Sequence, residues 1–563
     1  MLALAMTGAK ANLRYITETY DANGVIQKID MTSPEYFNFG CDIVDDIAVN
    51  DPDRRALVWC NDKGEERTFT FVDIKYYSDK TANFLRAQGI GKGDMVLVVL
   101  KRHYQFWFTA VALSKLGAVM IPATFMLKKH DVEYRIQVSG AKAAIVTADG
   151  DVTEQFDECE ATCPTLKTKI IVNGQREGWL DFNAEIEKAS ADFERIYTKS
   201  TDPMLSYFSS GTSGYPKMIM HSCDYPIGHI QTAKHWQCVV PDGLHLTIAD
   251  SGWAKCAWGK IYGQWIMEAG LFVYDFDKFD PGKILPKIGQ YKITTLCCPP
   301  TMFRFFLNHG IEGYDLSSLT HTNIAGEALS PDVYNTWYKA TGLKLYEGFG
   351  QSESTPIVCN TRGMEPKPGS MGKPSPQYTV DIVDADGNSC ETGFTGEIVV
   401  KYDPANHPQG LLTCYYGDKE KTDEVIHDGW YHTGDTAWRD EDGYYWYVGR
   451  NDDMIKSSGY RIGPFEIESV LLEHQSVLEC AVTSVPDPVR GQAVKATIVL
   501  RAGFTGSEEL TKELQTFVKK ETAPYKYPRV IEYVDALPKT SSGKIRRVEI
   551  RANDLKKWRE KQQ

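Results

Sequence analysis

Short apolar runs alternate with helix-length segments through most of the chain before Gly369. The run Met95–Leu100 is apolar throughout, as expected of a strand that is covered on both faces. A helix is predicted over Tyr104–Leu116. Further strands are predicted over Ala118–Pro122, Ala141–Val146, Lys169–Val172, Thr294–Cys298, His321–Ile324 and Leu343–Tyr346. This alternation predicts βαβ units and a mostly parallel sheet.

From about Gly369 onward the pattern changes to short strands joined by turns. Strands are predicted over Thr379–Val383, Gly396–Tyr402 and Tyr444–Val448. The tetrapeptides Asp384–Gly387 and Asp440–Gly443 are strong turn signals. This stretch therefore predicts a small antiparallel or barrel-like subdomain.

A polar, turn-like segment, Gly449–Asp453, separates that subdomain from a final α/β unit. The unit's predicted helices are Pro464–His474 and Glu508–Glu521, and its predicted strands are Leu478–Val485, Val494–Leu500 and Arg529–Val534. A chain of 563 residues exceeds the size at which one hydrophobic core keeps growing, so at least two domains are expected. We predict domains at residues 1–449 and 450–563.

Charge and cysteine content exclude several classes of function. The net charge is −13, which opposes a nucleic-acid-binding surface. The 13 cysteines lack convincing zinc spacing and indicate reduced thiols in a cytoplasmic protein. The most membrane-like stretch, Phe106–Met126, is interrupted by Lys115, Gly117 and Pro122, so no membrane span is expected. The N-terminal apolar run is too short for a secretory signal.

The segment Ser209–Lys217 is rich in small hydroxyl residues and glycine. Free backbone N–H groups and hydroxyls suit a phosphate, and Lys217 adds a compact positive charge. The lysine follows a proline, so the segment does not match a Walker A loop. An ordinary flexible loop is the open alternative. The candidate phosphate-binding residues are Ser209, Ser210, Gly211, Thr212, Ser213, Gly214 and Lys217.

A second segment, Glu347–Glu353, directly follows a predicted strand, where ligands of α/β sheets usually bind. Phe349 offers a flat face for an adenine ring. Ser352 can donate to a phosphate, and Glu353 can hold Mg²⁺ through oxygen. The alternative is a strand-to-loop turn that uses its two glycines for tight geometry.

Asp435 follows a glycine turn, and its carboxylate can accept both hydroxyls of a ribose diol. Arg450 lies about fifteen residues later and could bond a ribose or a phosphate, although a charged surface turn is the alternative. Arg461 follows a small polar stretch, and Lys544 lies on a glycine-bearing loop. Surface lysines are common, so Lys544 alone predicts nothing.

Taken together, these segments and residues resemble, in order and spacing, the adenylate-forming superfamily of acyl-CoA synthetases, adenylation domains and luciferases. The resemblance runs from about residue 35 to about residue 555. The phrases GYRIGPFEIE at Gly459–Glu468 and APYKYPR at Ala523–Arg529 are most similar to the medium-chain acyl-CoA synthetases.

The resemblance implies an α/β fold with a large N-terminal domain and a small mobile α+β C-terminal domain. The large domain would hold two α/β-layered sheets and a small β-barrel. The implied activity joins a carboxylic acid to CoA through an acyl-adenylate, with ATP, Mg²⁺ and coenzyme A. The implied partners are these small molecules, with no nucleic acid; a homo-oligomer stays open.

The resemblance also implies residue roles in the adenylation step. Lys544 would stabilise the transition state between carboxylate and α-phosphate, Glu353 would hold Mg²⁺, and Ser352 would assist. The nucleotide would further contact Gly326, Glu327, Ala328, Glu347, Gly348, Phe349, Gly350, Gln351, Asp435, Arg450 and Arg461, besides the phosphate loop.

For the CoA step, the resemblance implies rotation of the C-terminal domain about Asp452, because hinges are a few loop residues that absorb a large dihedral change. The residues expected at CoA are Ser458, Gly459, Tyr460, Arg490 and Arg529. The chain ends soon after Lys544, which argues against a carrier domain. A free-standing loader of a carrier protein, a luciferase-type enzyme and a non-catalytic ATP-binding protein remain the alternatives.

For the acyl pocket, Gly350 stands where acetyl-specific relatives carry Trp, which favours an acid larger than acetate. The resemblance implies a medium-chain, branched or aryl acid. Trp253, Lys255, Trp258 and Cys298 are the other expected pocket residues. Two indoles could bias the pocket toward short, branched or aryl acids. For Lys255 we favour an ammonium that reaches solvent, with a carboxylate or CoA contact as the alternative.

Overall fold

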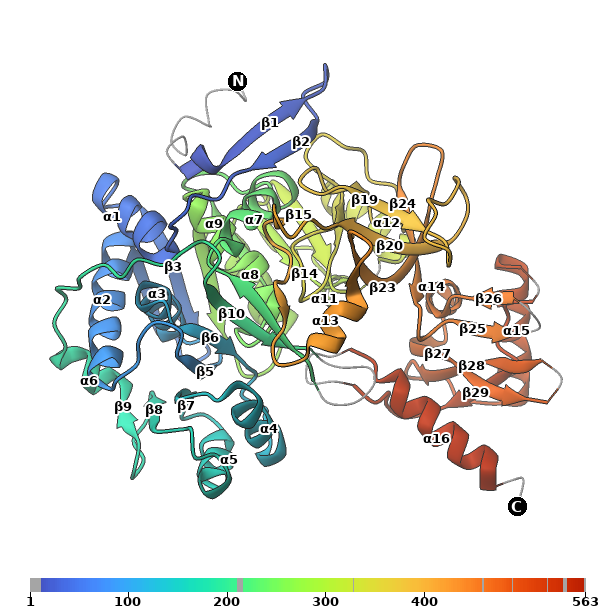
Figure 1. Ribbon diagram of the computed structural model, residues 1–563. Coiled ribbons are helices and arrows are strands. Elements are labelled where there is room, and N and C mark those ends of the chain that lie inside the picture. Colours follow the sequence, from blue (N-terminus) through green and yellow to red (C-terminus); the bar gives the residue numbers. More distant parts are fainter. Residues whose placement is uncertain are drawn as a thin grey trace.

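Two large sheets flanked by helices form most of the molecule, and the C-terminal unit is a separate lobe at one side (Figure 1). The computed structural model describes residues 12–209, 216–327, 329–457, 460–488, 490–523, 525–539 and 544–560. The side chains of residues 12, 460 and 461 are outside this description. The predicted α/β class is confirmed.

The first sheet is mostly parallel and eight-stranded, in the order β21-β11-β10-β6-β5-β7-β8-β9. Its central strand β5 is buried at every residue, as its continuous apolar run predicts. The bounds are β5 Met95–Val99, β6 Val119–Pro122, β7 Ala143–Thr147, β8 Thr168–Val172, β9 Leu180–Asp181, β10 Pro203–Phe208, β11 Met218–Ser222 and β21 Cys414–Tyr415.

The second sheet is nine-stranded, in the order β18-β17-β16-β15-β14-β12-β13-β3-β4, and parallel from β16 to β3. The bounds are β3 Arg55–Asn61, β4 Glu66–Thr70, β12 Leu244–Thr247, β13 Gly270–Asp275, β14 Thr295–Cys298, β15 His321–Ala325, β16 Leu345–Phe349, β17 Val358–Cys359 and β18 Lys373–Pro374.

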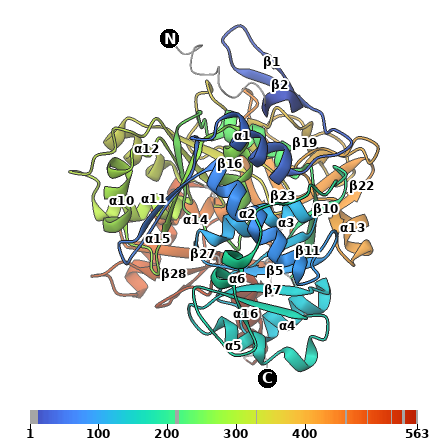
Figure 2. The same cartoon turned by 90° about the vertical axis from the view of Figure 1, so that its left-hand side faces the viewer.

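Helices pack on the faces of these sheets (Figure 2). They are α1 Asp46–Asn50, α2 Phe71–Ala87, α3 Gln105–Leu116, α4 Lys129–Ser139, α5 Val152–Asp157, α6 Phe182–Lys188, α7 Tyr225–Gln231, α8 Ala254–Gly259, α9 Tyr262–Ile266, α10 Pro281–Gln290, α11 Pro300–His309, α12 Pro331–Thr341 and α13 Lys419–Val425. A two-stranded hairpin, β1 Ile16–Tyr20 and β2 Ile26–Met31, extends from the body near the N-terminus (Figure 1).

The apolar stretch Phe106–Met126 forms helix α3 and strand β6 inside the protein. Lys115 within it is fully buried, and its ammonium lies 2.5 Å from Asp79 and 2.7 Å from Asp45. A buried charge is tolerated when it is paired in this way. Within the described parts of the chain, no helix is both long and apolar enough to cross a membrane.

Two smaller sheets complete the fold. The first is antiparallel, ordered β19-β20-β23-β22 with β24 paired to β23, and the second is ordered β26-β25-β28-β27 with β29 paired to β28. Helices α14 Pro464–Glu473, α15 Glu508–Glu521 and α16 Arg547–Glu560 belong to the same C-terminal unit as the second. The strands are β19 Val380–Val383, β20 Gly396–Lys401, β22 Ile426–His427, β23 Trp430–Arg439, β24 Tyr445–Arg450, β25 Ile455–Ser457, β26 Tyr460–Ile462, β27 Val477–Asp487, β28 Gly491–Leu500 and β29 Val530–Tyr533.

Candidate active site

Two neighbouring parallel strands, β15 and β16, end at the same edge of the nine-stranded sheet. Gly326 and Glu327 follow β15, and Gly350–Glu353 follows β16. Gly326 adopts a φ of +101°, which favours glycine at this turn. Ala328 lies outside the described residues. The carboxyl edge of a parallel sheet is where ligands usually bind, and the structure brings the two predicted adenine-binding segments together there.

Asp435 lies at the centre of a hydrogen-bonded cluster. One carboxylate oxygen accepts from the Tyr447 hydroxyl at 2.9 Å, and the other accepts from Nε2 of Gln351 at 2.5 Å. Arg450 is the cross-strand partner of Asp435 in the β23–β24 pair. Burial raises the pKa of the Asp435 carboxyl, while the charge of Arg450 and, more weakly, that of Lys544 act to lower it. Each carboxylate oxygen still has a second lone pair, so a ribose diol can be bonded here.

Lys544 belongs to the C-terminal unit, and its charge affects the Asp435 cluster. Its positive charge acts on the Asp435 carboxyl, although the two residues belong to different lobes of the chain. In this arrangement of the lobes, Lys544 is therefore close enough to Asp435 for its charge to act on the pKa of that carboxyl.

Glu353 follows β16 at the carboxyl edge of the nine-stranded sheet, and hydrogen bonds hold it in a fixed orientation. Its Oε1 accepts from the Tyr415 hydroxyl at 2.8 Å, and its backbone carbonyl accepts from the Leu412 amide at 2.7 Å. Ser352 is fixed by its carbonyl, which lies 2.8 Å from Nε2 of His221. Burial raises the pKa of the Glu353 carboxyl, and the Tyr415 hydrogen bond and the Arg450 charge oppose that rise. A fixed carboxylate with a second oxygen beyond Oε1 fits a hard cation such as Mg²⁺.

Glu347 is a buried carboxylic acid on β16, two residues before Phe349, the residue predicted to face the adenine ring. It is 4% exposed, and within the described residues its Oε2 has no hydrogen-bond partner. Burial raises its pKa well above the ordinary value. The Phe349 ring lies 5.9 Å from the Tyr447 ring. A buried polar atom without a partner is uncommon in native proteins, which makes Glu347 an unusual residue next to the predicted adenine-binding segment.

The predicted phosphate loop joins antiparallel strands β10 and β11. Its described ends are tied together: the Ser209 amide donates to the Lys217 carbonyl at 2.8 Å, and the Lys217 amide donates to Ser209 Oγ at 3.0 Å. The Lys217 ammonium lies 2.9 Å from Asp418 at the start of α13. Residues 210–215, and with them Ser210, Gly211, Thr212, Ser213 and Gly214, lie outside the described residues.

The predicted CoA residues lie in the C-terminal unit. Ser458 and Gly459 lie outside the described residues, and only the backbones of Tyr460 and Arg461 are described. The Arg490 amide donates to Asp487 at 2.8 Å. The Arg529 guanidinium donates to the Tyr527 hydroxyl at 2.5 Å. Roles for these residues stay predictions.

Trp258 packs against Gly350, one of the residues of the predicted acyl pocket. A Cβ placed on Gly350 would lie 2.5 Å from Trp258, so the indole fills the space that the missing side chain leaves. Trp236 packs edge-to-face on Trp258 at 5.9 Å and belongs to the same buried cluster. Cys298 is fully buried at the end of β14, and Trp253 precedes α8. An indole that is backed by a second indole therefore lies against Gly350.

The Lys255 side chain is partly exposed, so the expectation that its ammonium reaches solvent stays a prediction. Its ammonium donates at 2.6 Å to the carbonyl of Ala325, the last residue of β15, and the side chain is half-buried. A buried carbonyl without a partner would cost free energy, which favours this contact over a fully hydrated ammonium. Lys255 thus links α8 to the strand end that carries Gly326.

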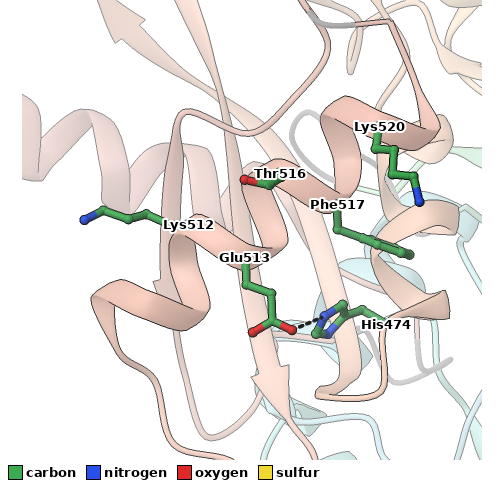
Figure 3. Close-up of a pocket in the computed structure, with 6 residues that line it drawn as sticks. All are labelled: His474, Lys512, Glu513, Thr516, Phe517 and Lys520. Atoms are coloured by element: carbon green, nitrogen blue, oxygen red, sulfur yellow. Dashed lines mark hydrogen bonds and ion pairs between the residues drawn. The ribbon is translucent and has the colours of Figure 1, made fainter.

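A separate depression of about 400 Å³ lies on the C-terminal unit, between the end of α14 and α15 (Figure 3). The His474 ring packs against Phe517 and lies 3.2 Å from Glu513. The depression is lined by His474, Lys512, Glu513, Thr516, Phe517 and Lys520. It contains none of the predicted site residues.

Comparisons with known proteins place these features in a family. The AMP-binding enzyme family matches residues 44–416, and the C-terminal domain of AMP-binding enzymes matches residues 466–544. The chain is 43% identical over 531 residues to the Homo sapiens protein "acyl-coenzyme A synthetase ACSM5, mitochondrial", covering 92% of this chain and 91% of that protein. It is 41% identical over 540 residues to Homo sapiens "acyl-coenzyme A synthetase ACSM3, mitochondrial", covering 94% and 92%.

Solved structures agree with this assignment. An anthranilate CoA ligase, AuaEII, in complex with anthranoyl-AMP superposes with a TM-score of 0.85 at 28% identity, covering 92% of this chain and 98% of that one. A Brucella canis acyl-CoA synthetase superposes with a TM-score of 0.71 at 31% identity, covering 94% and 96%.

Proposed function

The chain belongs to the AMP-binding enzyme family and is an ATP-dependent acyl-CoA synthetase, and we propose that its chemistry is centred on Asp435. A carboxylic acid and ATP give an acyl-adenylate and pyrophosphate, and CoA then takes the acyl group and releases AMP. The observation that supports this site is the buried Asp435 carboxylate, which Gln351 and Tyr447 orient and on which the charges of Arg450 and Lys544 act.

In the first half-reaction the substrate carboxylate attacks the α-phosphorus and pyrophosphate leaves. Asp435 and Arg450 hold the ribose, and Phe349 carries the adenine. Lys544 stabilises the negative charge that develops on the α-phosphoryl oxygens, because a positioned cation acts most strongly where charge appears. The attacking group is the substrate's own, so no protein nucleophile is needed.

Mg²⁺ belongs to this proposal as the ion that Glu353 would hold. When bound, it supplies positive charge at the phosphate oxygens. The support is the carboxylate that Tyr415 fixes through one oxygen.

In the second half-reaction the thiol of CoA attacks the acyl-adenylate. We propose that the C-terminal domain turns about Asp452, withdraws Lys544 and brings Gly459 to the acyl group. Ser458 and Tyr460 would line the pantetheine path, and Arg490 and Arg529 would meet the CoA nucleotide.

The acid substrate is proposed to be larger than acetate, and short, branched or aryl rather than long and straight. The indole of Trp258 against Gly350 supports this, because it occupies the space beside a residue of the predicted acyl pocket. Trp236 backs the indole and limits its movement.

Trp258→Ala is therefore expected to raise kcat/KM for octanoate relative to butyrate by about 10-fold or more, since each methylene newly accommodated contributes about 1 kcal/mol. Trp258→Phe is expected to give an intermediate ratio. Trp438→Ala removes an indole from the antiparallel subdomain and serves as the matched control. A ratio for Trp258→Ala equal to that of the unmodified enzyme would contradict the pocket assignment.

Acid-dependent pyrophosphate release tests the function as a whole. It should be measured on butyrate, 2-methylbutyrate, octanoate and benzoate, with CoA present or absent. Acyl-CoA is the expected product only when CoA is added. Transfer to a carrier protein without CoA would instead favour the loading alternative, and best turnover on octanoate would refute the proposed acid preference.

We propose a cytoplasmic location, because the 13 cysteines are free thiols and free thiols suit a reducing compartment. The relatives described above are named as mitochondrial, and a mitochondrial matrix is reducing as well. Fractionation of the source cells with an antibody to this chain would distinguish the two compartments.

A further inference from the structure

Helix α16 begins three residues after Lys544, and its first residue, Arg547, is firmly anchored. The Arg547 guanidinium bonds both carboxylate oxygens of Glu468 on α14, at 2.8 and 2.7 Å. Glu468 is 6% exposed and also accepts the Val482 amide of β27 at 2.8 Å. Bidentate arginine–carboxylate pairs fix geometry as well as charge, so the start of α16 is tied to both α14 and β27.

A second carboxylate holds the same helix from the predicted hinge. Asp453, the residue after Asp452, is 9% exposed and forms an ion pair with Arg551. Its other oxygen lies 3.9 Å from Arg547. Arg547 and Arg551 are four residues apart and therefore lie on one face of the helix. The first residue beyond the proposed pivot is thus in direct contact with the helix that follows Lys544.

We propose that Arg547, together with Arg551 and Asp453, positions Lys544 by joining the pivot rigidly to the start of α16. A rotation at Asp452 then moves Lys544 and α16 together as one rigid body. This inference rests on the proposed function, because it assigns the pair a role only in the half-reaction that uses Lys544. A misplacement of about 1 Å at a reacting centre can cost about 100-fold in rate, so loss of the anchor should be visible there.

The test measures the two half-reactions separately in the full-length protein. Acyl-adenylate formation is followed from acid and ATP, and thiolysis is followed from supplied acyl-adenylate and CoA. Arg547→Met is expected to slow adenylate formation by about 100-fold and thiolysis by less than about threefold. Arg547→Lys keeps the charge but loses the two-point contact, and is expected to recover part of the adenylation rate.

Lys557→Met is the matched control, because it removes an ion pair of 2.7 Å with Glu532 from the far end of the same helix. Both half-reactions should stay unchanged in it. Equal loss of both half-reactions in Arg547→Met, in step with a lower melting temperature, would overturn the inference and leave a purely structural role. If Arg547→Met does not fold, Arg551→Met removes one contact to Asp453 and provides the same comparison.

Measurements on the unmodified enzyme distinguish a failure of the positioning role of Arg547 from a failure of the proposed function. If it releases pyrophosphate with acid and forms acyl-CoA while Arg547→Met keeps the normal ratio of half-reactions, only the positioning role fails. If the unmodified enzyme does neither, the proposed function fails and the positioning role fails with it.

Discussion

Lys544→Ala is expected to slow acyl-adenylate formation by about 1,000-fold while thiolysis of supplied acyl-adenylate stays nearly intact. The lysine is needed where the substrate carboxylate and the α-phosphate, both anions, must meet. Its charge already acts to lower the pKa of the buried Asp435 carboxyl, which supports a role for the lysine at the proposed nucleotide site. Thiolysis has no second anion of this kind to bring together.

The measurement is the rate of each half-reaction in Lys544→Ala against the unmodified enzyme. Lys539→Ala is the matched control, because Lys539 precedes the same loop and forms an ion pair of 2.6 Å with Glu479. That variant should keep both rates. An equal fall in both half-reactions for Lys544→Ala would remove the proposed role of Lys544.

The parallel sheets could be predicted because their strands are buried on both faces. Met95–Val99 and Thr295–Cys298 are apolar at every position or nearly so, and burial on both faces demands this. Helix α16 was not predicted, because only Ile550 and Asp554 of its 14 residues are buried and no apolar stripe marks it. Its place in the fold depends on ion pairs to Asp453 and Glu468, which join residues distant in sequence.

The sequence was enough to propose candidate residues that follow glycine turns, but not to identify the side chains that support them in the fold. Tyr447 was missed because the β23–β24 pairing shifts register between Thr436 and Ala437. Such a bulge adds a residue and changes which side chains share a face, so alternation cannot place Tyr447 beside Asp435. The contact of Lys255 with Ala325, and the filling of the Gly350 space by Trp258, likewise depend on tertiary packing.

Asp452→Pro is expected to slow thiolysis by about 100-fold and adenylate formation by less than about 10-fold. The reason is that proline should disfavour the thiolysis arrangement of the two domains by roughly 3 kcal/mol, which lowers the population of that arrangement by about 100-fold. Proline fixes φ at residue 452 and restricts Asn451 as well. In the present arrangement the charge of Lys544 acts on the Asp435 carboxyl, and we assign this arrangement to adenylation, so a rigid turn should retain it and hinder the other. The Asp453 and Met454 amides both donate to the Arg450 carbonyl at 3.1 Å, so the backbone turn is closed by the residues that follow Asp452.

The side chain of Asp452 must be separated from its backbone in this experiment, because its carboxylate accepts from Nε of Arg450 at 3.0 Å. Asp452→Ala removes that contact and keeps the backbone free, so any effect it has on ribose binding can be subtracted. If Asp452→Ala leaves thiolysis fast while Asp452→Pro slows it, the loss belongs to the restricted dihedral angles. Equal rates for Asp452→Pro and Asp452→Ala at both steps would place the pivot elsewhere. The contact between Asp453 and α16 would then not couple a rotation at residue 452 to the position of Lys544.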